Sequence, residues 1–332
     1  MTRTSPTRRR FLGIAAASAA LLGSTPLYAA LQRPDDLPSL TTWHGIALGA
    51  NAQMQLLHPD PRQAEQLIQL AIGEIHRLEQ IFSLYRDDSA LVRLNRTGQL
   101  DRPPADLCRL LSEACALAEL TGGYFDPTVQ PLWDWYVRQG LHPAAAQPDT
   151  IRQALATVDY QAIDNRQDRI RLTRPGMAIT LNGIAQGYIT DRVTELLRAN
   201  GLEHAMIDLG EARSLGRPDP SRPWRAGLAD PTDTSRLLST IELHNQALAT
   251  SSGSGTLMDA HGVQTHLFDP HTGSAIPRWR SVSVRANDAT TADALSTAFS
   301  LMQEQQIRSI VVGFPAQAWL LPSGTDQLVK LG

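Results

Sequence analysis

Two oxygen-bearing side chains near the end of the chain have a spacing that could bring them together. Asp293 and Thr297 lie four residues apart in ATTADALSTAF, residues 289–299, a segment of helical character. Positions i and i+4 share one face of an α-helix, so the carboxylate and the hydroxyl would point to the same place. A plainer interpretation is also open. In it, Asp293 complements the helix dipole in the first turn and Thr297 hydrogen-bonds the carbonyl four residues back.

Three histidines, His261, His266 and His271, follow one another at intervals of five residues. This spacing sends successive side chains in different directions on a strand or a helix, so we do not expect them to share a metal ion. A single histidine acting as a general base fits better, because its pKa suits proton abstraction near neutral pH. His266 is the best-placed candidate, directly before an apolar pair and Asp269-Pro270, and a structural histidine is the alternative.

Two glycine-bearing segments could bind an anion. The passage DRIRLTRPGMAITLN, residues 168–182, predicts strands around a Pro175-Gly176 turn, and a helix is expected directly after Asn182-Gly183. A glycine at a helix N-terminus exposes backbone N–H groups to an anion, although it can equally serve close packing. The second segment, ALATSSGSGT at 247–256, could wrap a phosphate, but it lacks the lysine of a P-loop and can equally be a flexible turn.

Helices in the first half of the chain are expected to position these residues. Apolar side chains recur at helical spacing over residues 62–82, and PPADLCRLLSEACALAEL, residues 103–120, predicts a second helix that begins after two prolines. Residues 123–136, GYFDPTVQPLWDWY, combine prolines with clustered aromatics, which favours an ordered functional loop. Residues 141–150 suit a surface excursion.

Composition excludes several classes of protein. The 332 residues are 42% hydrophobic and 19% charged, which is typical of a soluble globular protein. Lys330 is the only lysine, so a mechanism built on an ammonium group is almost excluded. Cys108 and Cys115 lie two turns apart on one predicted helix, roughly 10 Å, which is too far for a disulfide.

Residues 1–29 have the features of an export signal. They contain RRRFL at 8–12, a short apolar region up to Leu22 and a small-residue cleavage site, LYA at 27–29. The paired arginines resemble a twin-arginine signal, and a basic cap on the domain is the alternative. Removing the four arginines of this segment, which holds no acid, takes the formal charge from −3 to −7 and argues against nucleic-acid binding. We therefore expect a periplasmic protein with a mature domain at 30–332, anchored to the membrane if the signal is retained.

The order of the motifs resembles a known family. FSLYRDDSALVRLN, GYFDPTV, LNGIAQGYITDRV, DLGEARSLG, ATSSGSGT, HLFDPHTG and TTADALSTAF together resemble the ApbE family of FAD:protein FMN transferases, from about Gly45 to Met302. HLFDPHTG and ADALSTA are the most specific of these. The resemblance implies a Mg²⁺-dependent enzyme that transfers the FMN half of FAD to a threonine hydroxyl of another protein and releases AMP. It also implies an ApbE-like, T-fold-related structure.

The resemblance assigns roles to individual residues. It makes Asp293, Thr297 and the backbone carbonyl of Gly183 the protein's ligands to Mg²⁺, a hard cation that takes oxygen ligands. It makes His266 the base that accepts the hydroxyl proton. FAD contacts are then expected at Leu48, Tyr85, Tyr124, Phe125, Asp126, Thr180, Gln186 and Leu267. Aromatic rings there can stack on flavin or adenine, and the carboxylate can accept hydrogen bonds.

Two positions depart from the family pattern. Thr180 stands where many members have an acid, and Gln186 stands where they have a lysine or an acid, so we expect an altered affinity for FAD. The form LNGIAQGYITDRV with DLGE resembles the NosX-type branch linked to nitrous oxide respiration. Members of that branch are exported by the twin-arginine route and flavinylate a membrane-bound regulator or electron-transfer protein.

Long helices interleaved with short strands predict a mixed α/β (α+β) fold in two closely packed lobes, with the cofactor in the cleft between them. Three other functions stay open. An FAD pyrophosphatase giving FMN and AMP would use the same metal site, a non-catalytic periplasmic flavin carrier or assembly factor would release no AMP, and a binding protein for a small solute would need no Mg²⁺ pair. Covalent flavin on a partner separates a transferase from a hydrolase.

Overall fold

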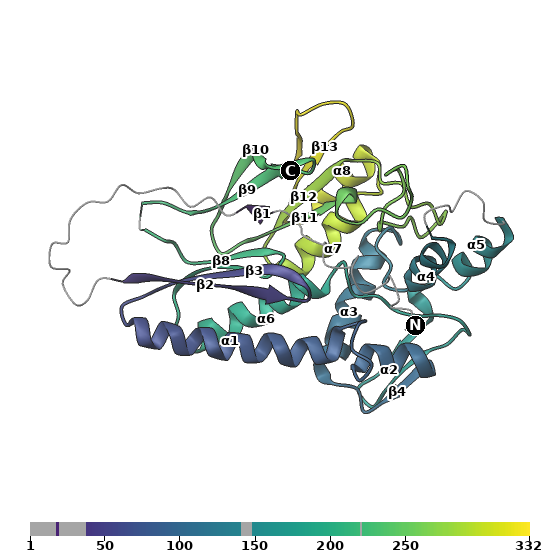
Figure 1. The fold of residues 1–332 in the computed structure, drawn as a ribbon, viewed down its shortest axis with the longest axis horizontal. Helices are drawn as coiled ribbons and strands as arrows, with labels where there is room; N and C mark the ends of the chain where they lie inside the picture. The colour runs from purple at the N-terminus through teal and green to yellow at the C-terminus, as the bar shows by residue number, and fades with distance from the viewer. Residues whose placement is uncertain (1–17, 20–37, 141–147, 220) are drawn as a thin grey trace, which may run out of the picture.

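The fold is built on one large antiparallel sheet, seen in a computed structural model that describes residues 18–19, 38–140, 148–219 and 221–332 (Figure 1). The sheet has eight strands, which confirms the mixed α/β prediction when taken with the helices around it. The strands in spatial order are β14 (Val329–Leu331), β13 (Gln317–Leu321), β12 (Ser281–Ala286), β11 (Ala247–Ser252), β8 (Ala212–Leu215), β7 (His204–Asp208), β3 (Ala50–His58) and β2 (Ser39–Ala47).

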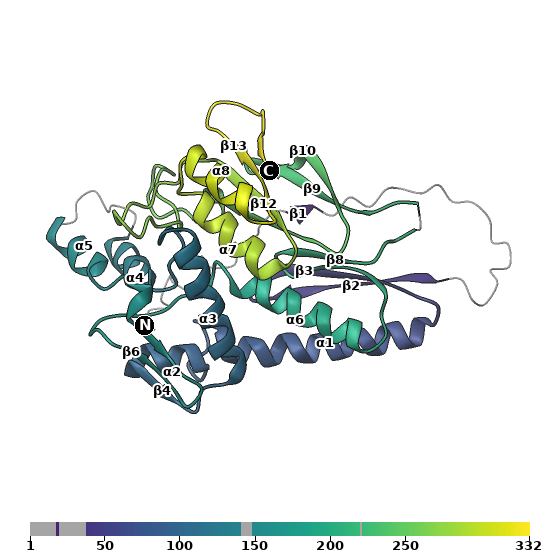
Figure 2. The ribbon, with the colours of Figure 1, turned by 180° about the vertical axis from the view of Figure 1, so that it is seen from behind.

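Three helices cover one face of this sheet. They are α1 (Pro61–Phe82), α6 (Ala185–Ala199) and α7 (Ala289–Phe299), and Figure 2 shows α6 between the other two. The predicted helix at 62–82 is confirmed as α1, and its first turn is capped by Asp60, whose side chain accepts the backbone N–H groups of Arg62 and Gln63. The buried stripes of the three helices and the sheet form the main hydrophobic core.

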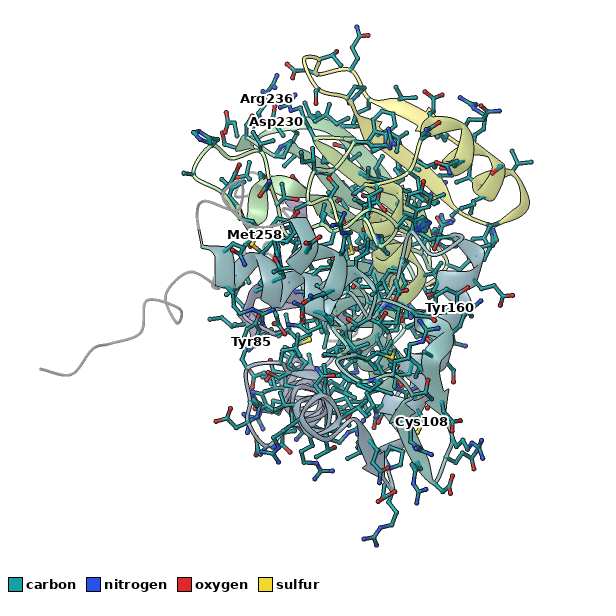
Figure 3. All side chains as sticks on the ribbon, turned by 90° about the vertical axis from the view of Figure 1, so that its right-hand side faces the viewer. Tyr85, Cys108, Tyr160, Asp230, Arg236 and Met258 are labelled. Atoms are coloured by element: carbon teal, nitrogen blue, oxygen red, sulfur yellow. The ribbon has the colours of Figure 1, made fainter. Side chains whose placement is uncertain are left out.

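The other face of the large sheet packs against a small one. Strands β9 (Trp224–Asp230) and β10 (Asp233–Leu243) form a hairpin, and β1 (Ser18–Ala19) pairs with β9. Apolar side chains from both sheets make a second core, which includes Trp224, Leu248 and Trp319. Asp230 lies at the hairpin turn beside Arg236, as Figure 3 shows, and also receives a 3.0 Å hydrogen bond from Arg280, which precedes β12.

The remaining elements pack at one end of the three helices. α3 (Ala105–Leu120) contacts α1 and α7, and it confirms the second predicted helix, with both cysteines free. Near it lie α2 (Ala90–Thr97) and a three-stranded sheet of β4 (Gln99–Asp101), β6 (Arg169–Leu172) and β5 (Ile163–Asn165). The short helices η3 (Tyr160–Ala162) and η4 (Gly253–Gly255) and the helices α4 (Gln130–Gln139), α5 (Pro148–Leu155) and α8 (Glu304–Gly313) complete the described fold. None of the described helices is long and apolar enough to cross a membrane.

The sequence predicts an ordered loop over residues 123–136, and this prediction is wrong for its second half. Helix α4 begins at Gln130, because Pro131 fits the first turn of a helix, where its missing N–H is not needed. The helix then buries a stripe of apolar side chains at helical spacing, formed by Leu132, Trp135 and Tyr136. The excursion predicted at 141–150 lies outside the described residues up to position 147, and α5 begins at 148.

The strands predicted around Pro175-Gly176 are also only half correct. Residues 169–172 form β6, but Ile179 lies outside any strand of the described sheets. Its backbone pairs instead with one side chain, since the N–H donates to Asn95 Oδ1 at 2.7 Å and the carbonyl accepts from Asn95 Nδ2 at 2.8 Å. An amide side chain thus satisfies the backbone groups that a neighbouring strand would satisfy.

Two boundaries differ from the sequence prediction near the glycine-bearing segments. Helix α6 begins at Ala185 with Ile184 as its N-cap residue, so Gly183 precedes the helix and does not form its N-terminus. Residues 247–252 of ALATSSGSGT form the central strand β11, and only residues 253–255 make the expected turn. The serine and threonine side chains of this strand therefore have fixed directions.

Candidate active site

A cavity opens where α6, α7 and β11 meet the loops 124–127 and 266–270. Its space, including open solvent at its mouth, is about 960 Å³. A third hydrophobic core, with Leu132, Met258 and Phe268, adjoins the cavity, since Phe268 also lines it. The walls contain ten of the twelve predicted site residues: Tyr124, Phe125, Asp126, Thr180, Gly183, Gln186, His266, Leu267, Asp293 and Thr297.

Helix α7 brings Asp293 and Thr297 to the same part of the cavity wall, as the four-residue spacing predicts. A Cβ at Gly183 would lie 2.8 Å from Thr297 Oγ1, so the glycine and the hydroxyl are in close contact. Asp293 Oδ2 accepts a 3.1 Å hydrogen bond from the backbone N–H of Gly187. The Asp293 carboxylate, the Thr297 hydroxyl and the backbone of Gly183 therefore line one cavity, with Thr297 in contact with Gly183.

These donors fit Mg²⁺, which prefers hard oxygen ligands and keeps some positions for water or substrate. The described residues contain no group of three His, Cys, Asp or Glu side chains arranged for a metal ion. A cation at this place would therefore depend on the Thr297 hydroxyl, the Gly183 carbonyl and substrate oxygens as well as on acids.

The plainer interpretation of Asp293, that it complements the dipole in the first turn of its helix, is wrong. Helix α7 begins at Ala289, so Asp293 lies in the second turn. The first turn is capped by Asp288, which accepts the Thr291 N–H, and by Asp191 of α6. The side chain of Asp293 is thus not needed for capping.

Asp191 fixes the start of α7 against α6. Its carboxylate accepts the backbone N–H groups of Ala289 and Thr290 at 2.8 Å each and the Thr290 hydroxyl at 2.6 Å. It also forms an ion pair with Arg213. Burial raises the pKa of Asp191, and the arginine opposes that rise. This cluster sets the position of α7 and therefore the position of Asp293 and Thr297.

The acidic residues of the cavity are buried next to one another. Burial raises the pKa of Asp293, the charge of Asp191 adds to the rise, and the Gly187 N–H opposes it. Burial also raises the pKa of Glu211 well above its usual range, together with the negative charges of Asp293 and Asp208. No lysine or arginine is found among the described residues that line the cavity. The electrostatics of this wall therefore favour a cation.

His266 is held with one ring nitrogen toward the protein. Its backbone N–H donates to the Thr256 carbonyl at 3.1 Å, and its Nδ1 lies 3.4 Å from the same oxygen. A proton on Nδ1 leaves Nε2 as a hydrogen-bond acceptor. Burial lowers the pKa of His266, which keeps the ring neutral near pH 7. The geometry suits a general base.

The other two histidines lie apart from this group. Among the described residues, neither His261 nor His271 lines the cavity, and the His271 ring packs against Tyr124 with centroids 4.6 Å apart. The prediction that the three histidines do not share a metal ion is consistent with this arrangement.

Several predicted FAD contacts also hold the cavity together. Asp126 Oδ1 accepts the Thr128 N–H at 2.7 Å and the Thr128 hydroxyl at 2.6 Å, and Oδ2 accepts the Tyr160 N–H at 3.1 Å. These bonds use most of the accepting capacity of the carboxylate that is predicted to contact FAD. The Thr180 N–H donates to the Pro127 carbonyl at 2.8 Å, which ties two parts of the wall together.

Two predicted contacts lie outside the cavity wall. Tyr85, which is labelled in Figure 3, is an exposed residue with 60% of its surface accessible. Its hydroxyl hydrogen-bonds the side chain of Asn182, which does line the cavity. Tyr85 is therefore a residue of the rim. Leu48 lies at the β2–β3 turn with φ 47°, where its N–H donates to Glu79 Oε1 at 2.7 Å. The structure does not bring Leu48 to the cavity.

Several residues of the wall have no role predicted from the sequence. Ser251 Oγ lies 3.3 Å from Thr297 Oγ1 and 2.7 Å from Ser296 Oγ, and Glu211 is buried beside Asp293. Both residues belong to motifs quoted for the resemblance, ATSSGSGT and DLGEARSLG, so a signal for them was present. The motifs alone could not show that strand β11 directs Ser251, and the β7–β8 turn directs Glu211, into the cavity.

Known proteins match this chain over most of its length. The ApbE family model matches residues 48–319. The FAD:protein FMN transferase of Haemophilus influenzae is 30% identical over 239 residues, 68% of this chain and 69% of that protein. The transferase of Treponema pallidum is 29% identical over 280 residues, 75% of each chain.

Solved structures agree with these sequence matches. The ApbE protein of Thermotoga maritima superimposes with a TM-score of 0.77 at 27% identity, covering 88% of this chain and 97% of the other. The flavinyl transferase ApbE of Pseudomonas stutzeri, at 22% identity, shares the fold with a TM-score of 0.75 over 89% and 94% of the two chains. With the family model matched from residue 48 to residue 319, this chain belongs to the ApbE family.

Proposed function

We propose that this protein is an FAD:protein FMN transferase that uses a divalent cation, with Mg²⁺ as the expected ion. The observation that carries the proposal is the convergence of His266 with Asp293 and Thr297 on one cavity. The relatives from Haemophilus influenzae and Treponema pallidum, which carry this activity in their names, support it.

The proposed reaction replaces the phosphoanhydride bond of FAD with a phosphate ester bond to the acceptor. The Oγ of an acceptor threonine attacks the phosphorus of the FMN half of FAD, and a new P–O bond forms. The bond between that phosphorus and the bridging oxygen breaks, and AMP leaves with the electron pair. His266 accepts the threonine proton at Nε2, because its other nitrogen faces the Thr256 carbonyl.

The residues of α6 and α7 would hold the cation beside the pyrophosphate. Asp293, Thr297 and the Gly183 carbonyl are its expected protein ligands, and the bound cation would neutralise charge that develops on the phosphate oxygens. The Gly187 N–H orients the carboxylate, and contact with Gly183 limits the movement of the hydroxyl. Positioning by rigid elements matters here, since phosphoryl transfer depends on alignment and charge neutralisation.

The test uses purified protein, FAD and a threonine-bearing acceptor domain, with and without Mg²⁺. We expect AMP release and an acceptor mass gain equal to FMN only when the metal is present. Asp293→Asn keeps an acceptor for the Gly187 N–H and removes the charge, so it is expected to lose transfer while remaining folded. AMP without a mass gain would favour the FAD pyrophosphatase, and FAD binding without AMP would favour a carrier.

The proposal includes a cellular location and a class of acceptor. Residues 1–29 would direct export by the twin-arginine route to the periplasm, where a membrane-bound electron-transfer flavoprotein would receive the FMN. Cell fractionation of a variant with Arg8→Lys and Arg9→Lys tests the route, and retention of normal export would contradict it. Loss of a covalently fluorescent membrane protein in a strain that lacks this chain would identify the acceptor.

A further inference from the structure

Glu211 is an acidic residue of the cavity wall that the proposed mechanism does not use. It is 3% exposed and follows Gly210, whose φ of 109° makes the turn between β7 and β8. A Cβ at Gly210 would lie 2.3 Å from Gln186 Nε2, so the turn is packed closely on α6. The backbone carbonyl of Glu211 also accepts a 3.3 Å hydrogen bond from Thr190 Oγ1 of α6. These contacts fix the residue relative to the helix that follows Gly183.

The carboxylate of Glu211 is only partly satisfied by the protein. It accepts a hydrogen bond from the Thr250 backbone N–H, whereas its Oε2 is buried and has no hydrogen-bond partner among the described residues. Buried polar atoms in folded proteins are nearly always paired, so an exception calls for an explanation such as a water molecule or an ion.

The acidic residues near Glu211 indicate that the missing partner of its Oε2 is a cation and not a water molecule. Asp293 and Asp208 are its charged neighbours, and the described residues of the cavity wall include no lysine or arginine. Like charges in a buried site repel strongly. A divalent cation between Glu211 and Asp293 would reverse the sign of that interaction, and it would use the unpaired Oε2.

We propose that Glu211 is a further oxygen ligand of the divalent cation that Asp293, Thr297 and the Gly183 carbonyl hold. The inference rests on the proposed function, because the cation is part of it. With Glu211 the protein supplies four oxygens, two of them anionic, which leaves about two positions of an octahedral Mg²⁺ for water or the FAD phosphates. The cation should therefore bind to the protein before FAD does.

The test measures Mn²⁺ binding to the metal-free protein in the absence of FAD, by the electron paramagnetic resonance signal of unbound Mn²⁺. We expect one Mn²⁺ to bind per chain and Glu211→Gln to bind it about 10- to 100-fold more weakly. Asp208→Asn is the matched control. Asp208 is a neighbouring carboxylate that contributes charge at Glu211 but does not line the cavity, so this variant should bind Mn²⁺ nearly as the native protein does.

Thermal unfolding of the same variants separates a ligand from a structural residue. In EDTA, Glu211→Gln should be at least as stable as the native protein, because it removes a negative charge beside Asp293 and Asp208. In Mn²⁺ it should gain less stability than the native protein. Lower stability in EDTA with unchanged Mn²⁺ affinity would assign Glu211 a structural role and overturn the inference.

The remaining outcomes distinguish this inference from the proposed function. Equal loss of affinity in Glu211→Gln and Asp208→Asn would indicate a general charge effect and overturn the ligand assignment. If Glu211→Gln binds Mn²⁺ with native affinity while Asp293→Asn does not bind it, the ligand assignment of Glu211 is overturned. The proposed metal site at Asp293 would then still stand. No Mn²⁺ binding by the native protein would overturn both the inference and the proposed use of a metal.

Discussion

His266 offers one nitrogen to the cavity because the other lies near a backbone carbonyl. The Thr256 carbonyl receives both the His266 N–H and the ring Nδ1, so backbone and ring are positioned by the same oxygen. Burial lowers the pKa of the ring below its ordinary value of about 6.5. A base with a lowered pKa remains unprotonated as the pH falls to moderately acidic values.

We expect His266→Ala to slow FMN transfer by about 10²- to 10⁴-fold, the usual contribution of a general base, with FAD affinity largely retained. Single-turnover kinetics and an FAD titration measure the two effects separately. In the native enzyme the acidic limb of kcat/KM should lie below pH 6.5, because the neutral ring is the active form. His261→Ala, an exposed histidine of the same region, is the control, and unchanged transfer by His266→Ala would remove it from the mechanism.

At the scale of elements, the site depends on the close approach of α6 and α7. Gly187 permits this approach, because a Cβ there would lie 2.2 Å from the Ala289 carbonyl oxygen. The same glycine supplies the N–H that binds Asp293. Gly187 thus sets both the packing of α6 against α7 and the orientation of the Asp293 carboxylate.

We expect Gly187→Ala to destabilise the fold by about 3 kcal/mol, because the added methyl group meets backbone that cannot turn aside. It should also weaken Mn²⁺ binding, since α7 must move. Gly73→Ala is the matched control on the exposed face of α1, where a Cβ meets nothing within 4 Å, and it should stabilise by about 0.5–1 kcal/mol. Urea unfolding measures both, and native stability in Gly187→Ala would contradict the packing argument.

A second prediction concerns the face of α3 that lies toward the start of α7. Burial, then the negative charges of Asp288 and Asp191, raises the pKa of Glu113 to about 6, with Arg109 opposing. The folded protein therefore binds this proton more tightly than the unfolded chain, whose glutamate pKa is about 4.3. It follows that stability falls as the pH rises from about 4.3 to about 6.

Glu113→Gln should remove this penalty. We expect a gain of at most about 1 kcal/mol at pH 8, after allowance for the partial exposure of the side chain, and no gain at pH 4. Urea unfolding at the two pH values measures the difference. Glu119→Gln, which changes an exposed acid on the same helix, is the control. A gain of equal size at both pH values would exclude a titration effect.

At the scale of the whole molecule, the cavity joins segments that are far apart in the chain. Its walls come from residues 124–133, 180–186, 211, 250–255, 266–270 and 293–297, and two of the hydrophobic cores contribute residues to them. A ligand that fills the cavity would contact all of these segments at once. Its binding energy should therefore stabilise the fold as a unit.

FAD with Mg²⁺ should raise the free energy of unfolding by about 2.7 kcal/mol at a ligand concentration 100 times its Kd. Thermal unfolding with FAD, with Mg²⁺ and with both measures this. We expect the combination to exceed the sum of the separate effects, because the pyrophosphate and the cation would share ligands. Asp293→Asn should abolish only the part that depends on the metal, and an additive response in the native protein would argue against a shared site.

The sequence by itself determined the elements whose signals are local. Apolar side chains at helical spacing gave α1 and α3, and the four-residue spacing placed Asp293 and Thr297 on one face of α7. The order of motifs gave the family, since these short segments stand in a fixed sequence. The same motifs identified the site residues, and ten of the twelve that were predicted line one cavity.

Tertiary structure decided where local preference was ambiguous or where distant residues meet. Ile179 forms no strand because Asn95, far away in the chain, satisfies its backbone. Leu48 stays outside the cavity because the β2–β3 turn is held by Glu79 of α1. The inward direction of Glu211 depends on a turn packed against α6. Such contacts join residues whose positions are fixed only after the whole chain has folded, so no local pattern could have predicted them.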